Sequence, residues 1–88
     1  MKIYEYDLVR TCIACPEQYD VYDKHNRQVG YLRLRHGTFR ADYPLCGGET
    51  VYESFPDGDG MFEDYERMYE LTKAIEAIHA RLVIDNKI

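Results

Sequence analysis

The feature that most constrains the fold is a change in the spacing of apolar residues about two-thirds of the way along the 88-residue chain. Before residue 56, apolar and polar residues alternate in short runs separated by turn residues, which is typical of β-strands. After residue 60 the apolar residues recur three and four positions apart, which predicts one long amphipathic helix. This stripe consists of Met68, Leu71, Ile75, Ile78 and Leu82.

Strands followed by a single helix predict an α+β domain. We expect one domain over residues 1–88, with an antiparallel meander of four to five strands over about residues 3–55. One long C-terminal helix, over about residues 61–83, should pack on one face of this sheet, and residues 84–88 should fray. The expected N-cap of the helix is Asp59 or Gly60. The predicted core consists of Leu32, Leu34, Phe39, Val51, Met68, Leu71, Ile75, Ile78 and Leu82.

The stretch YLRLRHGTFRADYP, residues 31–44, predicts a β-hairpin that gathers positive charge in an acidic chain. With His36 and Gly37 as a two-residue turn, Arg33 lies opposite Arg40 on the face that carries no apolar side chains. Two arginines directly opposite each other repel, so something negative or water must offset them. The candidate binding residues on this face are Tyr31, Arg33, Arg35 and Arg40.

The arginine face has two interpretations. It is either a solvated surface, with Glu17 of the preceding strand near Arg33, or a contact surface for an anion. Arginine binds phosphates and carboxylates and stacks on flat rings, so the second interpretation predicts a nucleotide-like ligand or an acidic protein surface as the partner. No nucleophile, base and orienting group can be assembled from the sequence, so we expect a non-enzymatic binding protein.

Charge is also segregated along the chain, which has 11 Lys and Arg against 16 Asp and Glu, a net charge of -5. Residues 27–43 hold four arginines and one aspartate, a net of +3, whereas residues 44–70 hold eight acids and one arginine, a net of -7. An acidic protein is a poor general DNA binder, so direct DNA binding is not expected. An alternative is that residues 49–70 imitate nucleic-acid phosphates and inhibit a nucleic-acid-binding protein.

The cysteines suggest a second alternative, a zinc-stabilised interaction module. Cys12 and Cys15 have the spacing of a zinc knuckle, and His36 and Cys46 would complete a Cys₃His set, although the second pair lacks local spacing. Otherwise the cysteines are small hydrophobes. We expect no transmembrane helix, because no run of about 20 apolar residues is present. We find no export signal and therefore expect a cytoplasmic protein with reduced thiols.

The chain has one resemblance to known proteins, and two stretches carry it: CPEQYDVYDKHNRQVGYLRLRHGTFRADYP and GDGMFEDYERMYELTKAIEAI. Over roughly residues 15–80 it resembles small uncharacterised proteins carried by prophages and other mobile elements of bacteria. The resemblance implies an accessory protein that binds a host or element component, such as an inhibitor or a sequestering protein. It carries over no functional residues.

Three aromatic residues beside the helix stripe predict an interaction surface. Phe62, Tyr65 and Tyr69 widen the apolar surface of the helix beyond what one small sheet can cover. We expect either a homodimer or a foreign partner at this surface, unless the N-terminal strand or the PLCGG loop covers it.

Overall fold

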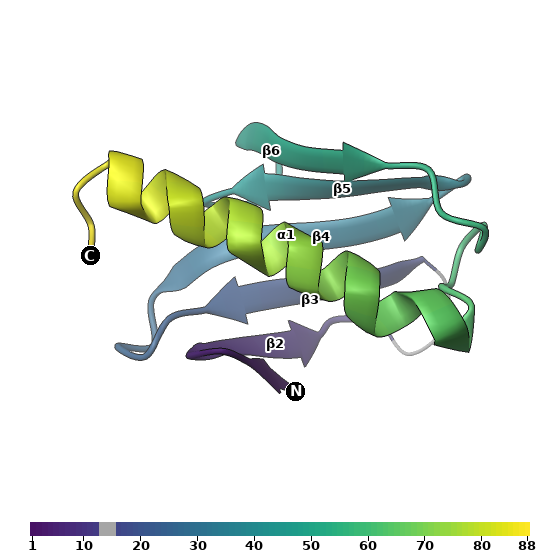
Figure 1. Ribbon diagram of the computed structural model, residues 1–88, viewed down its shortest axis with the longest axis horizontal. Helices are drawn as coiled ribbons and strands as arrows, with labels where there is room; N and C mark the ends of the chain where they lie inside the picture. Colours follow the sequence, from purple (N-terminus) through teal and green to yellow (C-terminus); the bar gives the residue numbers. More distant parts are fainter. Residues whose placement is uncertain (13–15) are drawn as a thin grey trace.

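The computed structural model describes residues 1–12 and 16–88 and shows an antiparallel sheet with one C-terminal helix packed on it (Figure 1). The sheet is a meander with the strand order β1-β2-β3-β4-β5-β6. The α+β prediction is confirmed, with six strands instead of four to five. The strands are β1 (Lys2–Ile3), β2 (Tyr6–Arg10), β3 (Glu17–Tyr22), β4 (Gln28–Arg35), β5 (Thr38–Tyr43) and β6 (Glu49–Ser54), and helix α1 spans Asp64–Ile84. Within the described residues, no helix is both long and apolar enough to cross a membrane.

The additional strand arises from a turn inside the first predicted strand. Tyr4 has a φ of 54°, and the chain reverses so that Ile3 pairs with Tyr6. Continuous alternation would place Tyr4 on the same side as Tyr6, but the turn leaves Tyr4 exposed and buries Ile3, Tyr6 and Leu8. The short β1 thereby adds Ile3 to the core.

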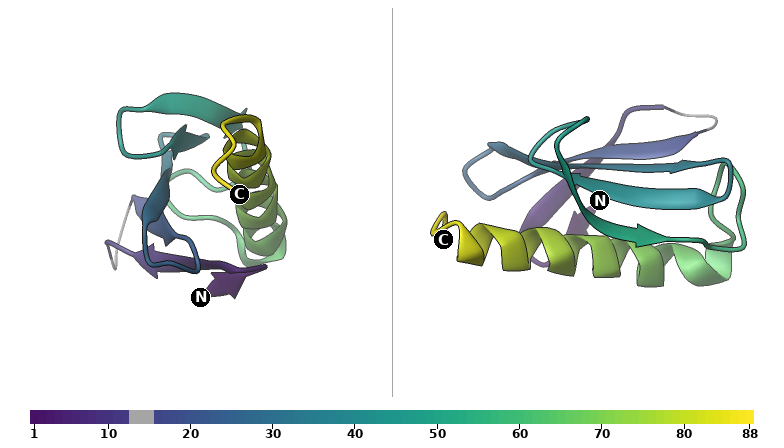
Figure 2. Two further views of the ribbon diagram at one scale, coloured as in Figure 1. Left: turned by 90° about the vertical axis from the view of Figure 1, so that its left-hand side faces the viewer. Right: turned by 90° about the horizontal axis from the view of Figure 1, so that it is seen from above.

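The sheet curves around the helix, as the left view of Figure 2 shows, from β6 on one side to β1 and β2 on the other. Contacts from both edges hold α1 in this position. Arg81 forms an ion pair with Glu49 of β6, with 2.6 Å between Nη1 and Oε2. On the opposite side, the Tyr6 hydroxyl lies 2.8 Å from Nδ1 of His79. One face of the sheet is covered by α1, and among the described residues no further helix or strand lies on the other face.

The core follows the predicted stripe with one error. Met68 is 52% exposed, and Phe62 fills this end of the core, with its ring centroid 4.8 Å from that of Phe39. Val51 is only half-buried. Met68 was misassigned because its spacing fits the stripe, whereas Phe62 precedes the helix and has no periodic signal. The remaining predicted core residues are buried, namely Leu32, Leu34, Phe39, Leu71, Ile75, Ile78 and Leu82.

Helix α1 begins later than expected, because its N-cap is Glu63 and not Asp59 or Gly60. The Glu66 carboxylate accepts the backbone N–H of Glu63 at 2.9 Å, as in a capping box. The residues expected to cap the helix instead attach the loop to the end of the sheet. The carbonyl of Asp59 accepts the Gly37 N–H at 2.9 Å, and that of Gly60 accepts the Glu17 N–H at 2.7 Å.

A buried ion pair joins β3 to the first turn of α1. Glu17, which is fully buried, accepts hydrogen bonds from Nε of Arg67 at 2.8 Å, the Tyr19 hydroxyl at 2.6 Å and the Phe62 N–H at 3.0 Å. Burial alone would raise the pKa of Glu17, but these bonds outweigh it and hold the pKa below its usual value. Burial and the bond to Glu17 raise the pKa of Tyr19 to about 12, so its hydroxyl keeps the proton that it donates.

This ion pair corrects the expectation that Glu17 lies near Arg33. Asp23 does pair with Arg27, with 2.9 Å between Oδ2 and Nε, as the predicted turn requires. A register shift between Val21 and Tyr22 then places Glu17 opposite Leu34. Because a one-residue shift moves a side chain to the other face of a sheet, Glu17 faces the helix and not the arginines.

The hairpin tip supplies a stability prediction. His36 and Gly37 have φ values of 54° and 77°, the left-handed values of a two-residue hairpin turn in which asparagine is favoured over histidine. We expect His36→Asn to raise the free energy of unfolding by up to about 1 kcal/mol, measured by urea denaturation. His25→Asn, in a turn residue without positive φ, is the control and should change little. A less stable His36→Asn variant would contradict the expectation.

Candidate anion-binding site

The β4–β5 hairpin has the register that the sequence predicted. Arg33 lies opposite Arg40, Arg35 opposite Thr38, and Leu34 opposite Phe39. Leu34 and Phe39 are fully buried under α1, so the arginines occupy the face of the sheet that no helix covers. The predicted shared face of the three arginines is therefore present in the folded chain.

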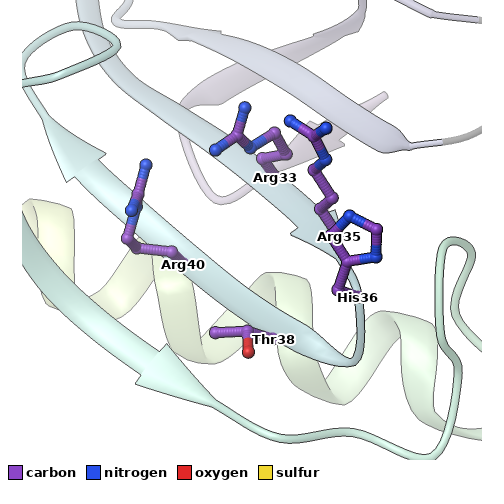
Figure 3. Close-up of a pocket in the computed structure, with 5 residues that line it drawn as sticks. All are labelled: Arg33, Arg35, His36, Thr38 and Arg40. Atoms are coloured by element: carbon purple, nitrogen blue, oxygen red, sulfur yellow. The ribbon is translucent and has the colours of Figure 1, made fainter.

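These arginines line a shallow hollow of about 420 Å³. Figure 3 shows the side chains of Arg33 and Arg35 rising from β4 and that of Arg40 from β5, with the three guanidinium groups pointing the same way. Two further lining residues come from the tip of the hairpin, His36 in the turn and Thr38 at the start of β5. The sequence analysis named His36 as a turn residue and a candidate zinc ligand and did not single out Thr38, although the register pairs Thr38 with Arg35.

Tyr31 lies outside the hollow, beside it along β4. Its hydroxyl donates to Oε1 of Gln18 on β3 at 3.0 Å, and its side chain is half-buried. Burial, followed by the neighbouring Cys46, raises the pKa of Tyr31, so the hydroxyl stays neutral. The structure thus groups three of the four predicted binding residues and gives the fourth an internal hydrogen bond.

The three arginines differ in their electrostatic surroundings. Nε of Arg40 lies 3.1 Å from Oδ1 of Asp42, whose buried carboxylate also accepts the Gly47 N–H and the Thr50 hydroxyl, each at 3.0 Å. No carboxylate of residues 1–12 and 16–88 lies within ion-pairing distance of Arg33 or Arg35. Arg40 has an internal ion-pair partner, whereas Arg33 and Arg35 form no ion pair with the described side chains. Acidic residues are still close to the cluster, because Glu53 of β6 lies opposite Arg40 and Asp59 lines a neighbouring hollow together with Arg35.

The acidic segment, residues 49–70, is largely bonded within the protein. Glu66 accepts the N–H groups of Asp57 and Gly58, each at 2.8 Å. Glu70 is buried and accepts the hydroxyls of Tyr52 at 3.0 Å and Ser54 at 2.7 Å. These acids hold the start of α1 against β6, which leaves fewer free carboxylates for imitation of a nucleic acid.

The predicted zinc ligands are spread over both ends of the sheet. Cys12 follows β2 and His36 follows β4, so both lie at the end where α1 begins, whereas Cys46 follows β5 at the other end. The six residues of β5 span roughly 20 Å, far more than the roughly 2 Å between zinc and a ligand. The structure does not bring His36 and Cys46 together, and Cys15 lies outside the described residues. Zinc binding stays a prediction.

The predicted interaction surface of the helix is smaller than expected. Phe62 is buried, whereas Tyr65 and Tyr69 are exposed, and Nζ of Lys73 lies 5.6 Å from the ring centroid of Tyr69. Tyr65 and Tyr69 therefore remain available for self-association or a foreign partner, and that prediction stays open.

Comparison of the chain with protein-family models, curated proteins and solved structures gives no match. The resemblance to mobile-element proteins therefore stays an expectation. Function has to be inferred from the arginine face and its surroundings.

Proposed function

We propose that this protein is a small non-enzymatic binding protein whose open sheet face contacts an anionic partner. Arg33, Arg35 and Arg40 make the contact, and His36 and Thr38 lie at its margin. The observation that supports this proposal is the pair Arg33 and Arg35, two guanidinium groups in one hollow with no acidic partner among the described side chains. An inhibitor or sequestering protein of a mobile element would act in this way.

The energetics favour an anion at this face without requiring one for folding. Repulsion between two exposed cations about 5 Å apart is roughly 1 kcal/mol in water, so the free protein tolerates the cluster. A charge-assisted hydrogen bond to a desolvated guanidinium contributes about 1.5–3 kcal/mol. Two arginines would therefore account for about two to four powers of ten in the affinity of a native partner, if their contributions add.

The experiment is a titration followed by ¹H–¹⁵N NMR, with a hexaglutamate peptide and inorganic pyrophosphate as separate anionic probes. We expect saturable shifts at the backbone amides of β4 and β5 and at the arginine Nε groups, weakened by added salt. Because these probes bind weakly, the double variant Arg33→Gln with Arg35→Gln should no longer show saturable chemical-shift changes. Glutamine keeps part of the side-chain stem and removes the charge, so the fold should be unaffected.

A matched control removes the same charge elsewhere. Lys24 and Lys87 are exposed, Lys24 in the β3–β4 turn and Lys87 beside Asp23 and Arg27 of the same turn, which is at the end of β4 opposite the hairpin tip. Lys24→Gln with Lys87→Gln should leave probe binding at the arginine face intact. If both double variants weaken probe binding equally, the binding depends on net charge and not on the arginine face, which contradicts the proposal. If neither probe binds the unsubstituted protein, the proposed function is refuted.

A further inference from the structure

We infer that the group recognised at the arginine face is a phosphomonoester and not a row of carboxylates. This inference rests on the proposed function, because it names the chemistry of the anion that the same face would bind. It follows from the density of positive charge, the kinds of donor in the hollow and the lack of an aromatic residue among its described lining residues.

The arginines are close enough to converge on one group. Arg33 and Arg35 are two residues apart on β4, roughly 7 Å along the strand. Arg33 and Arg40 are direct cross-strand neighbours, with Cβ atoms about 5 Å apart. Figure 3 shows all three guanidinium groups on the same side of the hairpin, and the arginine side chains are long enough to turn toward a single anion there.

The charge and shape of the ligand must match this donor set. A carboxylate has one negative charge and two oxygens in a plane, and one bidentate arginine satisfies it. A phosphomonoester carries a charge of about -1.5 to -2 at neutral pH and presents three acceptor oxygens in different directions. Two unpaired arginines with a third beside them suit a tetrahedral dianion better than separate carboxylates.

The other groups in the hollow fit this assignment. The His36 imidazole, which lines the hollow at the hairpin turn, adds a donor that is not a guanidinium group. The Asp42 carboxylate orients Arg40 through Nε and leaves its terminal nitrogens available. Asp42 is buried and its carboxylate also accepts the Gly47 N–H and the Thr50 hydroxyl, so its negative charge is shared among three donors.

The hollow provides few contacts for the part of the ligand that carries the phosphate. No aromatic side chain is among its lining residues in the described part of the chain, and the hydroxyl of the neighbouring Tyr31 is bonded to Gln18. The described lining residues therefore include no aromatic ring on which a nucleotide base would stack, and the ring of Tyr31 lies beside the hollow and not in it. The affinity should therefore reside in the phosphate, whether a phosphorylated side chain or a nucleotide presents it.

The test compares three probes at constant ionic strength by isothermal titration calorimetry and ¹H–¹⁵N NMR. The probes are a phosphoserine peptide, the same peptide with glutamate in place of phosphoserine, and AMP. We expect the phosphopeptide to bind at least about tenfold tighter than the glutamate peptide, because the dianion makes at least one more charge-assisted contact. Binding by the phosphopeptide alone would identify a protein source, and binding by AMP alone a nucleotide source.

Two variants link the binding to the hollow. Arg33→Gln with Arg35→Gln should abolish the preference for the phosphopeptide. Thr38→Val is the matched control at the margin of the same hollow, because Figure 3 shows the Thr38 hydroxyl turned away from the guanidinium groups, and it should leave the affinity for both peptides unchanged. Equal affinity for the two peptides would overturn the phosphomonoester inference and leave the proposed function intact. Binding by none of the probes would overturn both.

Discussion

Replacing Arg67 by methionine is expected to lower the free energy of unfolding by about 3–5 kcal/mol, because it leaves the Glu17 carboxylate buried without a cation. Arg67 is the residue through which the first turn of α1 is bonded to β3. Besides its bond to Glu17, it donates from Nη2 to the Phe62 carbonyl at 3.0 Å. Urea denaturation followed by circular dichroism would measure the loss.

The control is an ion pair of the same kind at the surface. Lys2 and Asp7 lie 3.4 Å apart with side chains 60% and 50% exposed, so Lys2→Met should cost about 0–1 kcal/mol. Replacing both buried partners, Glu17→Met with Arg67→Met, should recover much of the loss, because no unpaired charge then remains in the core. An Arg67→Met variant as stable as Lys2→Met would contradict the assigned role of the buried pair.

The same pair predicts how stability changes with pH. The hydrogen bonds to Glu17 lower its pKa in the folded protein below the ordinary value of 4.5, so the pair contributes its full stability above that pH. This contribution is lost as the pH falls through the lowered pKa. In Arg67→Met, burial without the cation should raise the pKa of Glu17, so unfolding should begin at a higher pH than in the wild type. Acid titrations of both proteins would show the difference.

Phe39→Ala is expected to lower the free energy of unfolding by about 3–5 kcal/mol, the usual cost of removing a buried aromatic ring. Phe39 is fully buried near the start of β5 and makes edge-to-face contacts with Phe62 and Tyr52, with ring centroids 4.8 Å and 6.0 Å away. Its loss leaves a cavity where β5, β6 and the start of α1 meet.

Phe55→Ala provides the matched control, because Phe55 is 75% exposed and follows the last residue of β6. This substitution should change stability by no more than about 0.5 kcal/mol. Chemical denaturation of both variants would show whether the loss of stability comes from the burial of Phe39 or from replacing a phenylalanine at any position. A small effect of Phe39→Ala would mean that the aromatic cluster is not part of the stable core.

The sequence by itself determined the elements whose signals are local. The spacing of Leu71, Ile75, Ile78 and Leu82 predicted the helix and its buried face, because a period of 3.6 residues places these side chains on one side. The pair His36–Gly37 predicted the register of β4 and β5, because a two-residue turn determines which residues face each other. The shared face of the three arginines followed from that register alone.

Tertiary structure decided the features that depend on contacts between distant segments. The shift between Val21 and Tyr22 turned Glu17 toward Arg67, 50 residues away in sequence. Gly30, opposite Val21, lies so close to Ile78 that a Cβ atom there would be 2.4 Å from the Ile78 Cδ1. No local sequence pattern predicts such a register shift, because the shift depends on how closely the helix packs against β3 and β4.

The same reason explains what the sequence left open at the candidate site. The sequence placed the arginines on one face, but it could not say whether acids lie beside them, because Glu17 was available to either face. Folding buried Glu17 against Arg67 and Asp42 against Arg40, and left Arg33 and Arg35 without a carboxylate within ion-pairing distance among the described residues. Side-chain alternation determines which residues share a face, whereas the register between strands and the packed helix determine which charges are neutralised.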